Sequence, residues 1–206
     1  EGNFENSQEI LDQVKKNTPK YGNDIDYVDQ LMKNVFEEFF RAVDGKPNGR
    51  GGKCRVNMLP TTVHVYFGSK CGASPDGRKA GRPLSEGISP VQGMDNRGPT
   101  AVFKSVSKLD HAKTGGTLLN QKLTPDIVKG DKEISKLARL IRAYFKMGAH
   151  HVQFNVVSAD LLREAKEKPE KYQNLIVRVA GYSDYFVNLT DELQDEIIER
   201  TAQQQF

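Results

Sequence analysis

The sequence is poor in cysteine, which restricts the sites that it can form. Only Cys54 and Cys71 occur among 206 residues, and neither belongs to a C-x-x-C motif. Sparse cysteine of this kind favours a reducing compartment, and the spacing matches no zinc motif. We therefore predict two free thiols and no metal site.

Long apolar runs and an excess of one charge are also missing. No apolar run approaches the roughly 18 residues of a membrane span. The 30 basic residues exceed the 27 acidic ones by only three and are scattered, whereas nucleic-acid-binding proteins usually show a clustered basic surface. The N-terminal residues lack both the features of a signal peptide and an initiator Met. We expect a cytoplasmic fragment that binds neither nucleic acid nor membrane.

Three stretches have the periodicity of amphipathic helices. The most regular runs from Asp24 to Val43, where apolar residues recur at intervals of three and four and form one wide stripe. The same spacing returns over residues 134–145. It appears again after Thr190, whose hydroxyl can cap a final helix with acidic residues in its first turn. We expect the stripe over 24–43 to face the core.

Short strands and one long irregular region complete the pattern. Strand-like segments cover residues 54–58, 62–67, 152–156 and 175–179. A short helix over 160–166 joins the last two, so we expect a β–α–β unit there. The region from 68 to 125 is rich in Gly, Pro, Ser, Asn and Asp, and irregular segments of this length are usually functional. These patterns predict an α/β protein.

The glycine-rich segment from Gly45 to Lys53 invites comparison with a phosphate-binding loop. Its lysine is followed by Cys54 instead of Ser or Thr, its glycine spacing differs, and no strand pattern precedes it. A turned linker is the better interpretation.

Gly181 lies at the end of an expected strand, within Leu175-Ile-Val-Arg-Val-Ala-Gly-Tyr-Ser183. One explanation is a turn whose backbone needs positive φ, which glycine adopts without steric cost. The neighbouring residues suggest a second explanation. Arg178-Val-Ala-Gly-Tyr-Ser183 resembles the motif R-V-[SA]-G-Y-[SA] of the glycyl radical enzyme family.

Further segments resemble this family in the same order along the chain. They begin at Leu59 (LPTTVHVYFG), Gly72 (GASPDGR), Pro83 (PLSEGISP), Gly98 (GPTA), Thr114 (TGGTLLNQK) and Gln194 (QDEIIERT). The resemblance implies the C-terminal portion of a ten-stranded α/β barrel of the pyruvate formate-lyase type over residues 1–145. A glycine radical domain would follow over residues 146–206.

The resemblance assigns the radical to Gly181. Removal of a Cα hydrogen leaves a planar carbon, delocalised over the flanking peptide groups, which a side chain would crowd. The family implies no bound cofactor, because an activating enzyme with S-adenosylmethionine and an iron–sulfur cluster removes the hydrogen. A buried loop tip would protect this oxygen-sensitive radical. The loop around it would consist of Arg178, Val179, Ala180, Tyr182 and Ser183.

The family's catalytic cysteine lies in a Gly-Cys-x-Glu-like motif. Neither Cys54 nor Cys71 is in such a motif. We therefore expect that cysteine in a missing N-terminal part of the same enzyme, and we expect this chain to be inactive alone.

The segments look most like the eliminating branch of the family, which includes choline trimethylamine-lyase, isethionate sulfite-lyase and the glycerol, propanediol and hydroxyproline dehydratases. This implies a lyase of anaerobic metabolism that removes water, an amine or sulfite from a small hydroxylated substrate. We expect Leu59, Thr61 and Val63 to approach the substrate pocket, and His64 to be a packed strand residue. Full-length protein is expected to form a homodimer, in the cytoplasm or inside a bacterial microcompartment.

Three alternatives stay open at this point. The chain could be a stand-alone subunit that donates a radical to a split or damaged partner, or part of a pyruvate formate-lyase-type acyltransferase. A plain binding module would require the ordered motifs to be coincidental. An upstream Gly-Cys-x-Glu loop in the gene would exclude the stand-alone subunit.

Overall fold

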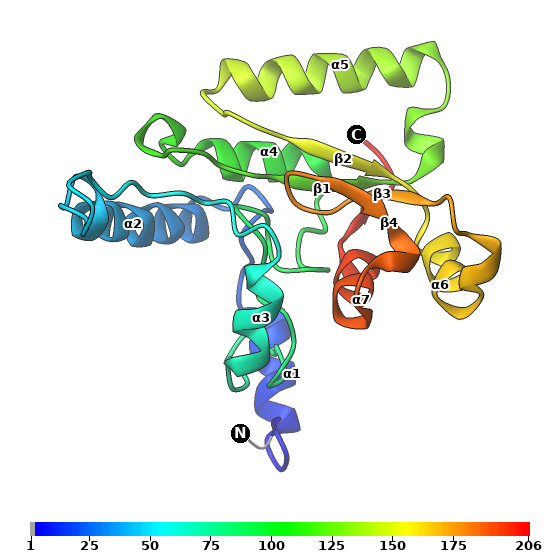
Figure 1. Ribbon diagram of the computed structural model, residues 1–206, viewed down its shortest axis with the longest axis horizontal. Helices are drawn as coiled ribbons and strands as arrows, with labels where there is room; N and C mark the ends of the chain where they lie inside the picture. Colours follow the sequence, from blue (N-terminus) through cyan, green and yellow to red (C-terminus); the bar gives the residue numbers. More distant parts are fainter. Residues whose placement is uncertain (1–2) are drawn as a thin grey trace.

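The computed structural model describes residues 3–206, which form helices around a small parallel sheet (Figure 1). The helices are α1 (Gln8–Asn17), α2 (Asp26–Val43), α3 (Val63–Lys70), α4 (Pro99–Ser107), α5 (Asp131–Lys146), α6 (Ala159–Glu167) and α7 (Asp191–Glu199). The strands are β1 (Asn120–Leu123), β2 (Gln153–Val156), β3 (Ile176–Arg178), β4 (Ser183–Tyr185) and β5 (Ala202–Gln203).

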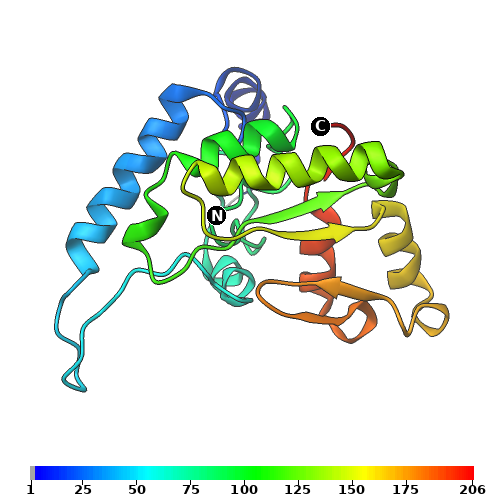
Figure 2. The same cartoon turned by 90° about the horizontal axis from the view of Figure 1, so that it is seen from above.

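The three-stranded sheet has β1 at its centre, with β2 and β5 parallel to it on either side. Helix α5 connects β1 to β2 and lies on one side of the sheet, while α6 and α7 lie on the other (Figure 1). Strands β3 and β4 form a separate antiparallel hairpin, which runs beside β2 (Figure 2). The hairpin turn therefore lies close to the parallel strands.

Buried apolar residues form two clusters. One joins α2, α4 and α5, where the rings of Phe103 and Tyr144 lie 4.3 Å apart between centroids. The other joins α6, α7 and the β3–β4 hairpin around Leu162, Phe186 and Ile197. The sheet draws its strands from both sides of residue 146, so the division expected there stays a prediction.

Several sequence expectations are confirmed. The segment over 24–43 forms α2, although Leu31, Val35 and Phe39 are more than half exposed, so the stripe faces the core only in part. The periodic segment over 134–145 lies within α5, and the alternating segment over 152–156 becomes β2. Thr190 is the N-cap residue of α7, although its side chain makes no capping hydrogen bond. These are the longest or most regular patterns in the sequence.

The strand expected over 62–67 is wrong, because residues 63–70 form helix α3. β-Branched and aromatic residues favour strands, but packing overrides this preference here. His64 and Gly68, one helical turn apart, are the buried residues of α3. A Cβ at Gly68 would lie 2.4 Å from the Arg82 carbonyl oxygen, so the helix depends on a residue without a side chain there.

Three other expectations also need correction. Within the region expected to be irregular, residues 99–107 form α4, with Pro99 in its first turn, and residues 120–123 form β1. The segment over 54–58 contributes an isolated bridge between Met58 and Thr117 instead of a strand. The expected β–α–β unit around α6 is absent from the described residues, because β3 pairs only with β4; the actual unit is β1–α5–β2.

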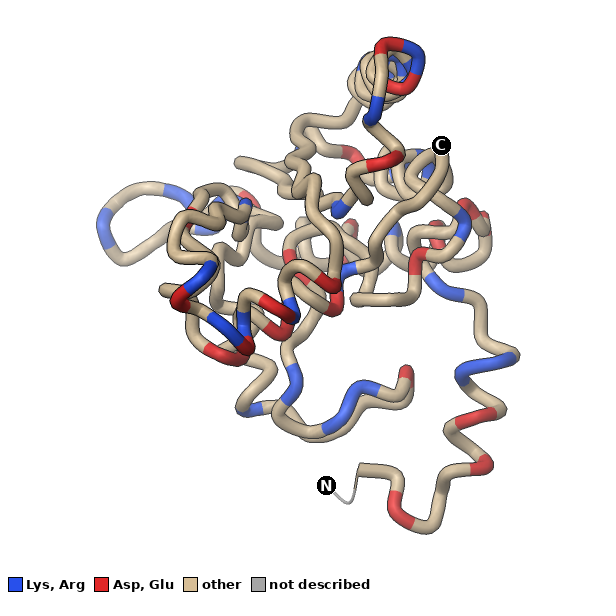
Figure 3. Tube along the Cα trace, turned by 90° about the vertical axis from the view of Figure 1, so that its right-hand side faces the viewer, with Lys and Arg blue, Asp and Glu red and all other residues tan. Residues whose placement is uncertain are grey.

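Charged residues of both signs are spread over the chain and interspersed (Figure 3). Among residues 3–206, no helix combines the length and the apolar character that crossing a membrane requires.

Candidate functional site

Gly181 occupies the turn of the β3–β4 hairpin. Arg178 pairs with Ser183 at the end of the ladder, and the Val179 N–H donates to the Tyr182 carbonyl at 2.9 Å. Ala180 and Gly181 are therefore the central residues of a tight turn. Gly181 has a φ of +83°, in the left-handed region that favours glycine. The turn by itself thus explains a glycine here.

The space into which a side chain at residue 181 would extend is apolar and open. A Cβ placed on it would lie 3.8 Å from Cδ1 of Leu118 and 3.9 Å from Cδ1 of Leu59. Apart from its chain neighbours, these are the described residues with an atom within 4 Å of that position. Gly181 is exposed within residues 3–206, so the buried loop tip expected from the sequence is wrong for this part of the protein. The flanking Val179 and Ala180 are buried.

The three residues expected near a substrate pocket lie at the start of α3 and just before it. Leu59 lies beside Gly181 and is 45% exposed, and Val63 is also exposed. Both side chains could therefore contact a substrate or another part of the enzyme. Thr61 has a φ of +58°, which β-branched residues rarely adopt. Such strained residues cluster at functional sites. The structure thus places Leu59 beside Gly181. Thr61, the residue with the strained backbone, follows Leu59 by two positions.

Side-chain amides from the parallel sheet hold the glycine loop. The Asn120 amide donates to the Val179 carbonyl at 3.1 Å. Gln153 accepts from the Gly181 N–H at 3.2 Å, and its amide nitrogen donates to the Val179 carbonyl at 3.3 Å. Asn155 bonds to both backbone groups of Arg178. All three amide side chains are buried, so few water molecules compete for these bonds.

The Arg178 side chain connects the two sides of the loop. Its Nε donates to Gln153 Oε1 at 2.9 Å, one Nη donates to the Ser183 hydroxyl and the other to the Gly181 carbonyl, each at 3.3 Å. Partial burial and the Arg178 cation both lower the pKa of the nearby His151. The remaining loop residue, Tyr182, lines an open groove with Tyr66 and Leu189.

Sequence reasoning missed Asn120, Gln153 and Asn155. In the strand pattern of 152–156, the alternation suggests that the polar residues face solvent and the apolar ones face the core. In the structure Gln153 and Asn155 are each 6% exposed, whereas Val156 is 49% exposed. The spacing of Gln153 and Asn155, two positions apart in a short strand, was the sole sequence feature that could have indicated a shared role. By itself, that spacing is common and indicates little.

A buried ionic network lies between the sheet and α7. Arg200 binds Glu196 through Nη2 at 2.7 Å and Nε at 3.1 Å, and its Nη1 donates to the Arg178 carbonyl at 3.3 Å. Nearby, burial raises the pKa of Glu86 to about 7, although Arg200 opposes this shift. His64, expected on a strand, is buried on α3 with Nε2 3.8 Å from Glu196 Oε2. This network anchors α7 to the backbone of the glycine loop.

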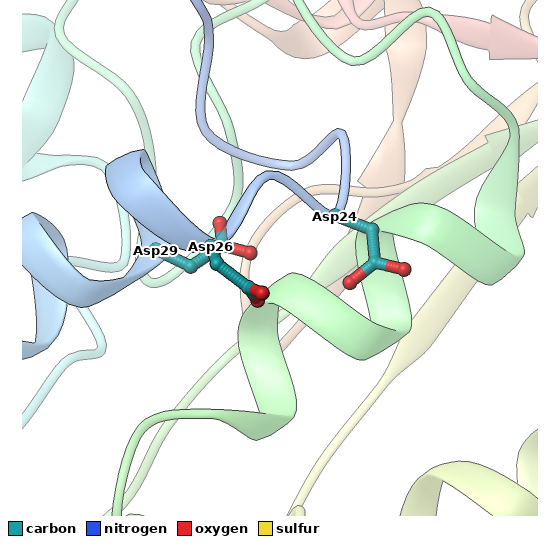
Figure 4. A group of neighbouring side chains, drawn as sticks. All are labelled: Asp24, Asp26 and Asp29. Carbon is teal, nitrogen blue, oxygen red and sulfur yellow. The ribbon is translucent and has the colours of Figure 1, made fainter.

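Three carboxylates gather at the start of α2, from Asp24, Asp26 and Asp29 (Figure 4). The Lys108 ammonium lies 3.1, 2.8 and 2.6 Å from their respective oxygens. Hydrogen bonding to this ammonium is the main cause that lowers the pKa of Asp24. The cluster is therefore an ion-pair network that ties α2 to the end of α4, and a cation already occupies it.

Comparison with known proteins places this geometry in a family. The family model described as "Glycine radical" matches residues 84–187, and the model "Pyruvate formate lyase-like" matches residues 1–68. The chain is 55% identical over 203 residues to trans-4-hydroxy-L-proline dehydratase of Clostridioides difficile, which covers 98% of this chain and 26% of that protein. It is 41% identical over 210 residues to isethionate sulfite-lyase of Bilophila wadsworthia, and this match covers 100% of this chain and 25% of that protein.

Solved structures agree with this result. The substrate-bound Clostridioides difficile hydroxyproline dehydratase superposes with a TM-score of 0.95, over 98% of this chain and 26% of that one. The B12-independent glycerol dehydratase from Clostridium butyricum superposes with a TM-score of 0.91 at 48% identity, over 98% of this chain and 25% of that one. The chain thus spans about a quarter of the length of these relatives. It has the α/β fold of the corresponding part of these pyruvate formate-lyase-like enzymes, and it belongs to the glycine radical family.

Proposed function

We propose that this chain is the radical-carrying C-terminal portion of a glycyl radical dehydratase, and that Gly181 carries the unpaired electron. Residue 181 falls within the segment matched by the glycine radical model, and the motif around it resembles that of the family. The observation that best supports the proposal is the proximity of Leu59 to Gly181. Its Cδ1 would lie 3.9 Å from a Cβ on Gly181, so the glycine loop meets the segment expected to approach substrate.

The radical would arise by removal of one hydrogen atom from the Gly181 Cα. An activating enzyme that cleaves S-adenosylmethionine at an iron–sulfur cluster would generate the radical that accepts this atom. Gly181 is exposed in this chain, and this supports access by such an enzyme when the glycine loop is not covered. No cofactor would then need to remain bound.

Catalysis would require a cysteine outside this chain. Cys54 and Cys71 are not among the described residues within 4 Å of the Gly181 position, other than its chain neighbours. A cysteine from the N-terminal part would give its sulfur-bound hydrogen atom to the Gly181 Cα and become a thiyl radical. The thiyl radical would then take a hydrogen atom from the carbon next to the hydroxyl-bearing carbon, and the hydroxyl group would leave as water with a proton from the substrate. The product radical would take the hydrogen atom back from the cysteine, which restores the thiyl radical.

The likeness to hydroxyproline dehydratase favours a hydroxylated amino acid as the substrate class. The relatives whose names specify dehydration of hydroxyproline and glycerol are 55% and 48% identical to this chain, above the 41% of the isethionate sulfite-lyase. We therefore place trans-4-hydroxy-L-proline first among the substrates to test. We expect the full-length enzyme to be a cytoplasmic homodimer, and association with a microcompartment stays a prediction.

The proposal is tested with the full-length protein, an activating enzyme, S-adenosylmethionine and reductant under anaerobic conditions. Electron paramagnetic resonance should show a doublet from one α-hydrogen, and this doublet should be absent in Gly181→Ala. The activated enzyme is then offered trans-4-hydroxy-L-proline, glycerol, propane-1,2-diol, choline and isethionate. A doublet without turnover of any of these would contradict the proposed reaction class, and no doublet with several cognate activating enzymes would contradict the radical assignment.

A further inference from the structure

Gly181 is hydrogen-bonded on both sides of its Cα. On the amino side, its N–H donates to Gln153 Oε1 at 3.2 Å. On the carboxyl side, its carbonyl oxygen accepts from an Arg178 Nη at 3.3 Å. A neutral acceptor therefore faces the N–H, and a cationic donor faces the carbonyl.

The two partners of Gly181 are bonded to each other. Gln153 Oε1 also accepts from Arg178 Nε at 2.9 Å, so one oxygen receives both N–H groups. On its other side, Gln153 Nε2 donates to the Asn120 side-chain oxygen and to the Val179 carbonyl. Donors surround the oxygen and acceptors surround the nitrogen, which determines the orientation of the amide. With 6% exposure, Gln153 is held in this position by its surroundings.

This arrangement matters for a radical at Cα, and the inference therefore rests on the proposed function. Such a radical is delocalised when the amide nitrogen gives electron density and the carbonyl withdraws it. A hydrogen bond donated by the N–H increases the electron density on nitrogen. A guanidinium that donates to the carbonyl oxygen increases electron withdrawal, and such charge-assisted bonds are stronger than neutral ones.

We propose that Gln153 and Arg178 are positioning residues that polarise the two peptide groups on either side of Gly181 and so stabilise its Cα radical. Neither residue exchanges an atom with the radical; they act through the peptide groups. The pair also keeps Gly181 at the apolar position beside Leu59 and Leu118.

The test compares full-length wild type with Gln153→Leu, Gln153→Glu and the control Gln173→Leu, all activated anaerobically. Gln153→Leu has similar volume but no acceptor, and we expect about a fivefold lower radical yield, the change typical of losing one hydrogen bond. Its doublet splitting should widen, because more spin stays on Cα. Gln153→Glu keeps an oxygen acceptor, so its splitting should remain at or below the wild-type value. Gln173→Leu makes the same change at an exposed position of the connection before β3 and should behave as wild type.

A second readout does not depend on the radical. Hydrogen–deuterium exchange of resting protein should be about fivefold faster at the Gly181 amide in Gln153→Leu than in wild type, again the effect of one hydrogen bond. If Gln153→Leu destabilises the protein globally, Arg178→Lys replaces it. This variant keeps the positive charge but cannot donate to Gln153 and to the Gly181 carbonyl at the same time, so its doublet splitting should also widen. Wild-type yield, splitting and exchange in Gln153→Leu would overturn the inference while leaving the proposed function intact. If activated wild type itself shows no doublet, the proposed function is contradicted instead.

Discussion

Asn155 and Arg178 are paired as two strand residues would be, but through a side chain. The Arg178 N–H donates to Asn155 Oδ1 at 2.7 Å, and Asn155 Nδ2 donates to the Arg178 carbonyl at 2.7 Å. Among residues 3–206, strand β3 pairs with β4 alone, so it has no backbone ladder to β2. The buried amide of Asn155 takes the place of that ladder and fixes the hairpin at the residue that precedes the glycine turn.

Replacing Asn155 by Ala should loosen the hairpin. The variant loses two hydrogen bonds and leaves the Arg178 N–H without this acceptor, so the local opening free energy should fall by about 1–3 kcal/mol. Hydrogen–deuterium exchange of a peptide over 176–185 measures this opening. Asn174→Ala, at an exposed position of the connection before β3, is the control and should leave exchange unchanged. Equal protection in both variants would show that the pairing does not hold the hairpin.

Replacing Gly181 by Ala should abolish the doublet at a modest cost in stability. The added methyl group has room, since its nearest neighbours would be 3.8 and 3.9 Å away. The positive φ should still cost about 1–2 kcal/mol, because Cβ crowds the carbonyl in this conformation. Gly148→Ala is the matched control, with a φ of +96° and open space around it. It should lose similar stability, measured by urea unfolding, and retain the doublet; a doublet in Gly181→Ala would place the radical elsewhere.

Air should cleave activated protein at Gly181. Oxygen adds to a carbon radical, and the exposed glycine turn offers no barrier within this chain. Mass spectrometry after aerobic exposure should detect two fragments that divide at residue 181. Activated samples kept anaerobic, and Gly181→Ala samples exposed to air, should stay intact. An undivided chain after the doublet has disappeared in air would argue against a radical at this position.

Glu86 should make stability fall with rising pH. Burial raises its pKa to about 7, so between the ordinary carboxyl pKa and pH 7 the unfolded chain releases a proton that the folded protein retains. The contribution of the neutral acid is complete below the ordinary pKa and is lost as the pH rises through about 7. Relative to wild type, Glu86→Gln should therefore gain stability between pH 5 and pH 8.

Urea unfolding of both proteins at several pH values measures this difference. Glu170→Gln, at an exposed position, is the control and should show no such trend. A stability difference between Glu86→Gln and wild type that stays constant across this range would mean that Glu86 is ionised in the folded state throughout.

Elements with long, regular patterns could be predicted from the residues alone. The apolar stripe of α2 and the periodic segment of α5 follow from spacing alone, because a helix face must be apolar to pack. The glycine motif was equally readable, since both its family resemblance and its turn depend on local residues. Pro99 after Gly98 could have indicated the start of α4, but the surrounding glycines and prolines concealed it.

The surroundings of Gly181 depend on contacts between distant segments and could not be predicted from local patterns. Residues 62–67 have strand-forming composition, yet residues 63–70 form helix α3, whose Gly68 permits close packing against Arg82. Gln153 and Asn155 are the polar residues of an alternating strand, yet both are buried, and their side chains bind the backbone of the hairpin. Local propensity cannot anticipate such bonds, since residues 23 to 28 positions apart make them. The identity of the glycine was thus a local property, whereas its hydrogen-bonded setting arises from chain segments that meet only on folding.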